Sequence, residues 1–388
     1  MTSSFQFEFA TASRILFGPG AVAGIGESAR ALGSCALLVT GRHPARAVRV
    51  RSLLETGGVM AVPFFVTGEP TIEMVAKGIE QARRERCDLV IGCGGGSAMD
   101  TAKAVAVLLT NEGGPLDYLE VIGRGRPITK PGVPCIAVPT TAGSGAEVTR
   151  NAVLASSEDK VKASLRSHFL LPRLAIVDPE LTRDLPPAIT SVTGLDALTQ
   201  LIEPYVCRRA NPVTDGFCTT GLRLVARSLR RAWENGYDTS ARQDMSLASL
   251  CSGLALANAG LGAVHGFAAP IGGAFSAPHG AVCAALLPVV MEVNLRALRS
   301  RCPGAPTIAR YGQIAEILTG HAGASAEAGV AWVRELCRVF AVQGLGSYGV
   351  RTSDAPALAD KAAKASSMKA NPVTLTREEL EEILLRSI

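Results

Sequence analysis

Short apolar runs alternate with helical stretches through residues 1–185, and this alternation constrains the fold more than any other feature. Five runs are typical of buried strands: CALLVTG (35–41), MAVPFFV (60–66), CDLVIGCGGG (87–96), CIAVPTTAG (135–143) and LAIVDPE (174–180). Amphipathic stretches such as 71–86 and 97–110 separate them. Apolar strands that alternate with helices belong to parallel sheets covered on both faces. The pattern therefore predicts an α/β domain whose ligand lies beyond the carboxyl ends of the strands.

After the paired prolines Pro186 and Pro187 the chain changes to long helical stretches, such as 213–235 and 241–260. The residue before a proline resists helix, so the pair marks a natural boundary. We therefore predict two domains, a parallel-sheet Rossmann-like α/β domain over 1–185 and an all-helical domain over 186–388. In the last helical stretch, Thr376 is the expected N-cap, followed by an acidic first turn.

Composition restricts the possible partners of the chain. Of its 388 residues 47% are apolar and 19% are charged, which is typical of a globular protein large enough for two cores. The net charge of +5 is small, and the basic run 42–51 is best explained as a solvated helix face, so we expect no nucleic-acid partner. Ten cysteines without CxxC spacing, no apolar leader and no long apolar window predict a cytoplasmic protein that does not enter a membrane.

Three consecutive glycines, Gly94 to Gly96, separate a predicted strand from a predicted helix that begins near Ser97. Glycine lets backbone amides approach a phosphate closely, and a helix N-terminus adds unpaired N–H groups and a positive dipole end. The pattern is neither GxGxxG nor a Walker loop, since Lys103 lies too far into the helix. The turn thus favours a pyrophosphate site, with a purely structural turn as the alternative.

A second loop follows the strand that begins at residue 135. It carries two threonine hydroxyls, Thr140 and Thr141, and then Ser144 between two glycines. Alone, this loop fits a hydroxyl-capped turn equally well. Two glycine- and hydroxyl-rich loops at one edge of a sheet favour a bound ligand more strongly than either does by itself.

Two further patterns suggest metal chemistry. In GLDALTQLIEPYV, Asp196 and Gln200 lie one helical turn apart on the same face. His265 and His279 flank a segment rich in glycine and proline, and a helix–turn–helix could bring both imidazoles to one point. Neutral imidazole is the commonest metal ligand. The alternatives are a helix with two polar residues and a pair of core histidines.

Four ordered motifs, GGGSAMDTAK, PTTAGSGAEVT, GLDALTQLIEPYV and GAVHGFAAPIGGAFSAPHG, resemble the iron-containing (group III) alcohol dehydrogenase family. The resemblance runs from 14–33 to 371–384, essentially the whole chain. It implies an NAD(P)-binding domain over 1–185 and a metal-binding and substrate domain over 186–388. It also implies NAD(P)-dependent interconversion of a small alcohol and its aldehyde or ketone by a homodimer or larger assembly.

The resemblance also implies roles for individual residues. The expected cofactor contacts are Gly95, Gly96, Ser97, Asp100, Thr140, Thr141, Ser144, Thr149, Lys162 and Leu181. The expected metal ligands are Asp196, Gln200, His265 and His279, of which Asp196, His265 and His279 are also the expected catalytic residues. The ion they would hold is Fe²⁺ or Zn²⁺, which would act as a Lewis acid on the substrate oxygen.

Two positions depart from the family pattern. The family has a histidine ligand where this chain has Gln200, a neutral and weaker oxygen donor, so we expect a lower metal affinity. A carboxylate and two imidazoles are still sufficient for a catalytic zinc or iron(II) site. The family often has a second histidine, thought to help proton transfer, where this chain has Ala269. The proton is then expected to leave through water or a cofactor hydroxyl.

The end of the first predicted strand bears on cofactor choice. An acidic residue there usually binds the 2′-hydroxyl of NAD and repels the 2′-phosphate of NADP. This chain has Gly41 followed by Arg42, which favours NADP, with a plain surface arginine as the alternative.

Three other functions are compatible with parts of the pattern. One is a metal-independent carbonyl reductase like the maleylacetate reductases, although GGGSAMD and PHG favour the ordinary branch. Another is a cofactor-binding relative without turnover, which Gln200 and Ala269 keep open. The third is a lyase of the dehydroquinate synthase type, against which the segment around His265 and His279 speaks.

Overall fold

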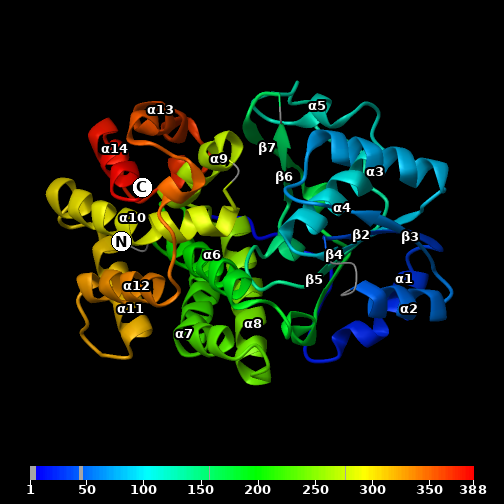
Figure 1. Cartoon of the computed structure of the whole chain (residues 1–388), viewed down its shortest axis with the longest axis horizontal. Coiled ribbons are helices and arrows are strands. Elements are labelled where there is room, and N and C mark those ends of the chain that lie inside the picture. The colour runs from blue at the N-terminus through cyan, green and yellow to red at the C-terminus, as the bar shows by residue number, and fades with distance from the viewer. Residues whose placement is uncertain (1–5, 43–46, 157, 276) are drawn as a thin grey trace. The chain divides into compact units, whose positions relative to one another are not determined.

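The computed structural model describes residues 6–42, 47–156, 158–275 and 277–388, and Figure 1 shows the arrangement of their helices and strands. The chain forms two compact units. One is Ala10–Asp184, and the other is Leu185–Ile388 together with residues 6–9.

A six-stranded sheet in the order β1-β8-β5-β4-β2-β3 forms the centre of the first unit, and every neighbouring pair is parallel. The strands are β1 (Ile15–Phe17), β2 (Cys35–Thr40), β3 (Met60–Phe65), β4 (Leu89–Gly94), β5 (Cys135–Pro139) and β8 (Leu174–Val177). The predicted parallel sheet is therefore confirmed, and the five strands β1 to β5 are connected in succession through helices. β1 is an addition that the apolar runs did not indicate, because it is only three residues long.

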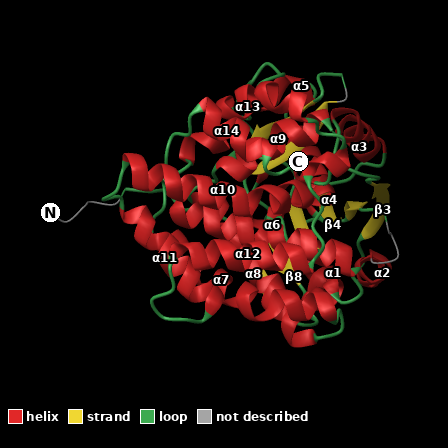
Figure 2. Cartoon of the chain, turned by 60° about the vertical axis from the view of Figure 1, so that its left-hand side comes forward, coloured by secondary structure: helices red, strands yellow, loops and turns green. Residues whose placement is uncertain are grey.

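Helices cover both faces of this sheet, as Figure 2 shows around the strands drawn in yellow. They are α1 (Ile25–Arg30), α2 (Val48–Thr56), α3 (Ile72–Arg84), α4 (Gly96–Leu108) and the short α5 (Pro115–Tyr118). Alternate side chains of β2 enter opposite cores, as strand geometry requires. Leu37 and Val39 join the core with α3 and α4, whereas Ala36 and Leu38 join the core with α1 and α2.

The helix α3 illustrates why the predicted helical stretches form where they do. The Thr71 side chain caps its first turn by accepting a hydrogen bond from the Met74 backbone N–H. Val75, Ile79 and Ala82 then recur at helical spacing and are buried against the sheet. The sequence thus sets both the start and the buried face of this helix.

An antiparallel hairpin, for which the sequence patterns predicted no strands, follows the second glycine-rich loop. It consists of β6 (Asn151–Ser156) and β7 (Val161–Arg166). Its alternating half-buried and buried side chains are the ordinary pattern of a strand with one solvated face. In β6 the apolar Val153 and Ala155 are half-buried and Ser156 is buried, so residue polarity does not follow that alternation.

The second unit is helical throughout its regular structure. Its helices are α6 (Pro187–Val206), α7 (Pro212–Glu234), α8 (Thr239–Asn258), α9 (Ala263–Ala274), α10 (His279–Arg301), α11 (Pro306–Thr319), α12 (Ala326–Val339), α13 (Ala355–Lys364) and α14 (Arg377–Leu385). The predicted α/β-then-helical fold class is confirmed. Among the described residues, one single helix, α10, is long and apolar enough to cross a membrane, but 83% of its apolar window is buried inside the protein, as in a core helix.

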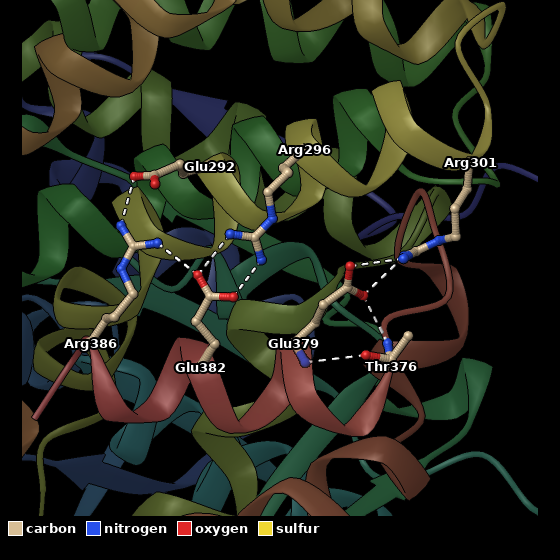
Figure 3. A network of polar contacts seen from close by, with 7 residues as sticks. All are labelled: Glu292, Arg296, Arg301, Thr376, Glu379, Glu382 and Arg386. Carbon is tan, nitrogen blue, oxygen red and sulfur yellow. Dashed lines mark hydrogen bonds and ion pairs between the residues drawn. The ribbon is translucent and has the colours of Figure 1, made fainter.

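The C-terminal helix α14 begins at a capping box and is joined to α10 by ion pairs (Figure 3). Thr376 accepts a hydrogen bond from the Glu379 backbone, and the Glu379 carboxylate accepts one from the Thr376 backbone, which confirms the predicted N-cap. Glu379 also pairs with Arg301, and Glu382 pairs with Arg296, both of them on α10. These ion pairs attach the C-terminal half of α10 to α14, and the first turn of α10 belongs to the site described next.

Candidate metal and cofactor sites

Four side chains of the helical unit bring one donor atom each to a common point. Asp196, His265, His279 and Cys283 present ligand atoms that all lie within 4.8 Å of one another. The Asp196 Oδ1 atom is 3.6 Å from the Nε2 atoms of both histidines. The Cys283 sulfur is 3.9 Å from Nε2 of His265 and 3.7 Å from Nε2 of His279.

Three helices supply these donors, α6 and the two consecutive helices α9 and α10. Asp196 lies in the middle of the buried helix α6, and His265 lies in the first turn of α9. His279 is the first residue of α10, where the preceding Pro278 is extended, and Cys283 follows one helical turn later on the same face. The His279 side chain is 38% exposed, whereas those of Asp196 and His265 are each 6% exposed, so the cluster is open on the His279 side.

A buried carboxylate orients His265. The Nδ1 atom of His265 lies 2.6 Å from Oε2 of Glu203, and Oε1 of Glu203 accepts the Val264 backbone N–H at 2.7 Å. Metal-binding histidines typically donate their other N–H to a carboxylate in this way. The other carboxylate oxygen of Glu203, by accepting the Val264 N–H, satisfies an amide of the first turn of α9. The N-cap Gly262 cannot do this because it has no side chain. Glu203 thus holds the Nε2 lone pair of His265 towards Asp196 and Cys283.

The charges within the cluster support one another. Burial opposes ionisation of Asp196, but His279 and His265 outweigh it and hold the pKa of Asp196 below its ordinary value. Burial likewise opposes ionisation of the Cys283 thiol, and the two histidines again outweigh it and lower the pKa of that thiol. In return, the Cys283 sulfur is the main cause of the raised pKa of His279. The raised pKa values of His279 and His265 favour their protonated forms, so a metal ion, which binds carboxylate, thiolate and neutral imidazole, would displace these protons.

The residues present fit a divalent metal ion. Asp196 Oδ1 is fully buried and has no hydrogen-bond partner among the described residues, since 3.6 Å is too long for a hydrogen bond to either imidazole. A buried carboxylate oxygen without a partner is costly, and a cation between it and the two Nε2 atoms would satisfy it. Asp196, His265 and His279 therefore fit a divalent ion, and their role as its ligands stays a prediction.

The two departures from the family pattern lie in well-defined surroundings. Gln200 is buried one turn after Asp196, and its side-chain oxygen accepts a hydrogen bond from the Ser252 hydroxyl at 3.0 Å. That contact uses one of the two lone pairs of the oxygen and leaves the other available to a metal ion. The role of Gln200 as a ligand therefore stays a prediction. Ala269 lies on α9, one turn after His265, and carries no group that transfers protons.

In the α/β unit, the strand ends bring the two predicted cofactor loops together. Gly94, the last residue of β4, pairs with Pro139 of β5. A Cβ atom on Gly95 would lie 3.4 Å from the Thr141 hydroxyl, and a Cβ atom on Gly96 would lie 3.1 Å from the Ser144 hydroxyl. The glycine turn and the hydroxyl-rich loop are therefore in direct contact at the carboxyl edge of the sheet.

The first turn of α4 has the form expected of an anion cradle. Gly95 is its N-cap and has no side chain, so no N-cap side-chain oxygen competes for the first amides of this turn, which include that of Ser97. Thr140 follows directly, since its backbone N–H donates to the Gly94 carbonyl at 2.9 Å. These positions make Gly95, Gly96 and Ser97 suitable for a pyrophosphate, and their cofactor role stays a prediction.

A buried lysine holds the second loop against α4. Lys103 forms an ion pair with Asp100 at 2.9 Å and donates to the Thr149 hydroxyl at 3.0 Å. It also donates to the backbone carbonyls of Ala146 and Asn151. Asp100 and Thr149, which were predicted to contact the cofactor, are thus engaged with Lys103, and any cofactor contact they make is additional.

The remaining predicted cofactor residues lie at separate places in the same unit. Lys162, on β7, is almost fully buried and pairs with Glu69 at 3.2 Å. Leu181 packs, half-buried, against the core formed with α1 and α2. Gly41 follows β2 at the carboxyl edge of the sheet, and the Arg42 guanidinium donates to the Thr67 carbonyl at 3.0 Å.

Sequence reasoning missed three functional candidates, Glu203, Cys283 and Lys103. Cys283 follows His279 by four residues and Glu203 follows Asp196 by seven, spacings that place each pair on one helical face. The spacings were detectable signals. Lys103 was considered only as a phosphate ligand, and no sequence signal indicates that its partners are loop carbonyls.

Comparisons with known proteins agree with this arrangement. Residues 12–179 match the model of the family described as iron-containing alcohol dehydrogenase, and residues 190–388 match the C-terminal model of that family. The 1,3-propanediol dehydrogenase of Klebsiella pneumoniae is 36% identical over 392 residues, covering 97% of this chain and 98% of that protein.

Two solved structures are similar over nearly the whole length of the chain. The crystal structure of a 1,3-propanediol oxidoreductase has a TM-score of 0.92 at 35% identity, covering 99% of this chain and 100% of that one. That of sulfoacetaldehyde reductase from Bifidobacterium kashiwanohense in complex with NAD⁺ has a TM-score of 0.86 at 26% identity, with 99% of both chains covered.

A parallel α/β unit with a glycine-rich strand–helix turn, followed by a helical unit with a buried donor cluster, is the arrangement of a nicotinamide-dependent oxidoreductase whose helical unit could hold a metal ion. Within that class, the chain belongs to the iron-containing alcohol dehydrogenase family. The predicted resemblance and the predicted enzyme class, an oxidoreductase of the alcohol dehydrogenase type, are both confirmed.

Proposed function

We propose that this enzyme interconverts a small alcohol and its aldehyde or ketone by hydride transfer to and from a nicotinamide cofactor, with a divalent metal ion held by Asp196, His265 and His279. The observation that carries the proposal is the convergence of these donors around the unpartnered, buried Oδ1 atom of Asp196. A bound ion would supply Lewis-acid polarisation of the substrate oxygen.

The residues of the chain contribute orientation and charge. Asp196 provides the negative charge that lowers the cost of burying a cation. Glu203 fixes the ring orientation of His265, so that its Nε2 atom faces the cluster. His279, with its exposed edge, borders the open side from which a substrate oxygen can approach. Because position 269 is an alanine, we propose that the alcohol proton leaves through water or a cofactor hydroxyl.

Replacement of the histidines tests this proposal. His265→Ala and His279→Ala should each remove most turnover and lower metal content, while binding of the nicotinamide cofactor stays unchanged. His321→Ala, a substitution of an exposed histidine outside the cluster, is the matched control. Full activity in both variants and in the metal-stripped enzyme would reject the metal-assisted reaction in favour of a metal-independent carbonyl reductase. Cofactor binding without turnover on a panel of alcohols and aldehydes would indicate a non-catalytic relative.

For the cofactor, we propose that Gly95, Gly96 and Ser97 bind the pyrophosphate and that NADP is preferred over NAD. The absence of a carboxylate at Gly41 and the position of Arg42 beside it, at the carboxyl edge of the sheet, support this preference. The ratio of kcat/KM for NADP and NAD should fall in Arg42→Ala and stay unchanged in the control Arg84→Ala. A ratio unaffected by Arg42→Ala would contradict the assignment.

We further propose a cytoplasmic homodimer or larger homo-oligomer. All ten cysteines, each within the described residues, are free, which suits a reducing compartment. The sheet edge at β3 exposes Met60 and Phe65, and exposed apolar edge strands commonly pair with another chain. Light scattering coupled to gel filtration should give at least twice the 40.3 kDa of one chain, and a monomer at micromolar concentration would refute the assembly.

A further inference from the structure

The cluster contains one donor beyond the three assigned above, the Cys283 sulfur. Four donors at bonding distance from a tetrahedral zinc ion lie about 3.3–3.7 Å from one another. The separations here are 3.6 Å from Asp196 Oδ1 to each histidine Nε2 atom, and 3.7 and 3.9 Å from the Cys283 sulfur to the same two atoms. Four of the six donor–donor separations are thus close to those of a zinc site, and the other two are at most 4.8 Å, so all four donors can surround one ion.

The surroundings of Cys283 point the same way. Its side chain is fully buried in the first turns of α10, where the helix fixes its position relative to His279. Its sulfur contacts the Nε2 atoms of both histidines, which are the nitrogen atoms that face the cluster. The buried Asp196 Oδ1 atom without a partner is an independent sign that a cation belongs at this point.

Gln200, by contrast, has a hydrogen-bond partner outside the cluster. Its side-chain oxygen accepts a hydrogen bond from Ser252, and Ser252 lies on α8, which contributes no donor to the cluster. An amide oxygen is also a neutral and weak ligand, whereas a thiolate is charged and binds zinc strongly. The structure therefore offers a better fourth donor than the residue at the position expected from the sequence.

We propose that Cys283 is the fourth protein ligand of the metal ion, and that this sulfur shifts the preference of the site towards zinc. The inference rests on the proposed metal site of Asp196, His265 and His279. On coordination, the thiol proton leaves to solvent and the sulfur bonds to the ion as a thiolate. The substrate oxygen would then bind as a fifth ligand from the open side at His279, a coordination that zinc can adopt in catalytic sites. Thiolate ligands favour zinc over iron(II) more than oxygen ligands do, so the effect falls on metal choice as well as on affinity.

Cobalt(II) substitution tests the sulfur bond directly. The enzyme is stripped with a chelator and titrated with Co²⁺ under anaerobic conditions. Wild type should show a near-ultraviolet sulfur-to-cobalt charge-transfer band at one ion per chain. Cys283→Ser should still bind cobalt without this band, whereas Gln200→Ala and Cys302→Ser, which replaces an exposed cysteine, should retain it. X-ray absorption of the zinc-loaded wild type, which needs no variant, should show one sulfur at about 2.3 Å.

Metal competition tests the shift in preference. Most sites bind zinc more tightly than iron(II), so the informative quantity is the change between variants. In equimolar Zn²⁺ and Fe²⁺, the bound zinc-to-iron ratio should fall in Cys283→Ser, and zinc affinity should fall about tenfold or more, as loss of a metal-supporting group typically causes. The control Cys302→Ser should change neither quantity.

The outcomes separate this inference from the proposed function. Cobalt bound by the wild type without a sulfur band, or an unchanged zinc-to-iron ratio in Cys283→Ser, would overturn the role of Cys283 and leave the three-ligand site intact. No divalent metal bound by the folded wild type would overturn both. A band that disappears only in Cys283→Ser establishes the sulfur ligand.

Discussion

Glu203 gives the sharpest test of how the site is supported, because it contacts the cluster only through His265. Its carboxylate, 4% exposed, accepts the Nδ1 contact of His265 at 2.6 Å and the Val264 backbone N–H at 2.7 Å. Hydrogen bonds to a charged group contribute about 1.5–3 kcal/mol each. Glu203→Gln retains one acceptor oxygen and loses the charge. It should lower the free energy of unfolding by about 1.5–3 kcal/mol, the value of one such hydrogen bond.

Metal affinity distinguishes positioning of His265 from plain stabilisation of the fold. A freed imidazole can rotate, so the dissociation constant for Zn²⁺ or Co²⁺ should rise by about 10–100-fold in Glu203→Gln. Urea unfolding of the metal-stripped enzyme measures the free energy of unfolding, and chelator competition with the folded enzyme measures the metal dissociation constant.

Glu55→Gln is the matched control, because Glu55 pairs with Arg51 on the surface of α2. Exposed pairs contribute less than about 1 kcal/mol, and this one lies outside the helical unit that holds the metal site. If Glu203→Gln matches the wild type in both unfolding and metal affinity, then Glu203 does not position His265.

Glu147 is buried, one of its oxygen atoms has no partner among the described residues, and burial raises its pKa to about 7. The folded state therefore binds the proton more tightly than the unfolded state, and a stabilising contribution of about 3 kcal/mol is present below pH 4.5 and is lost as the pH rises to 7. Glu147→Gln should flatten this pH dependence of unfolding, and an unaltered profile would contradict it. Lys103→Met leaves the Asp100 carboxylate and two loop carbonyls without their cation, so the free energy of unfolding should fall by about 3–5 kcal/mol. Equilibrium titration should also show weaker binding of the nicotinamide cofactor. Gly94→Ala would place a Cβ atom 2.7 Å from that of Ala98. The free energy of unfolding measured by calorimetry should therefore fall by about 1–3 kcal/mol. An unchanged free energy of unfolding would show that α4 moves freely away from β4.

The sequence predicted the α/β unit from local patterns, and the strands lie where the apolar runs indicated. The predicted strand ends ran too far, since the run 135–143 forms a strand only over Cys135–Pro139. The chain leaves the ladder after Thr140, whose backbone N–H still donates to the Gly94 carbonyl, and Thr141 lies next to Gly95, a change that composition alone does not indicate. The hairpin of β6 and β7 escaped prediction because β6 has apolar residues at half-buried positions and a serine at a buried one.

Local sequence alone determined the glycine-rich turn, the helical face of Asp196 and the candidate histidines, because each depends on neighbours within a few turns of chain. Only the tertiary structure decided that Cys283 and Glu203 belong to the same site. Donors from α6, α9 and α10 approach within 4 Å of one another there, although up to 87 positions separate Asp196 from Cys283 in the chain. Helical periodicity reports which residues share a face, whereas the packing of three helices decides which faces meet.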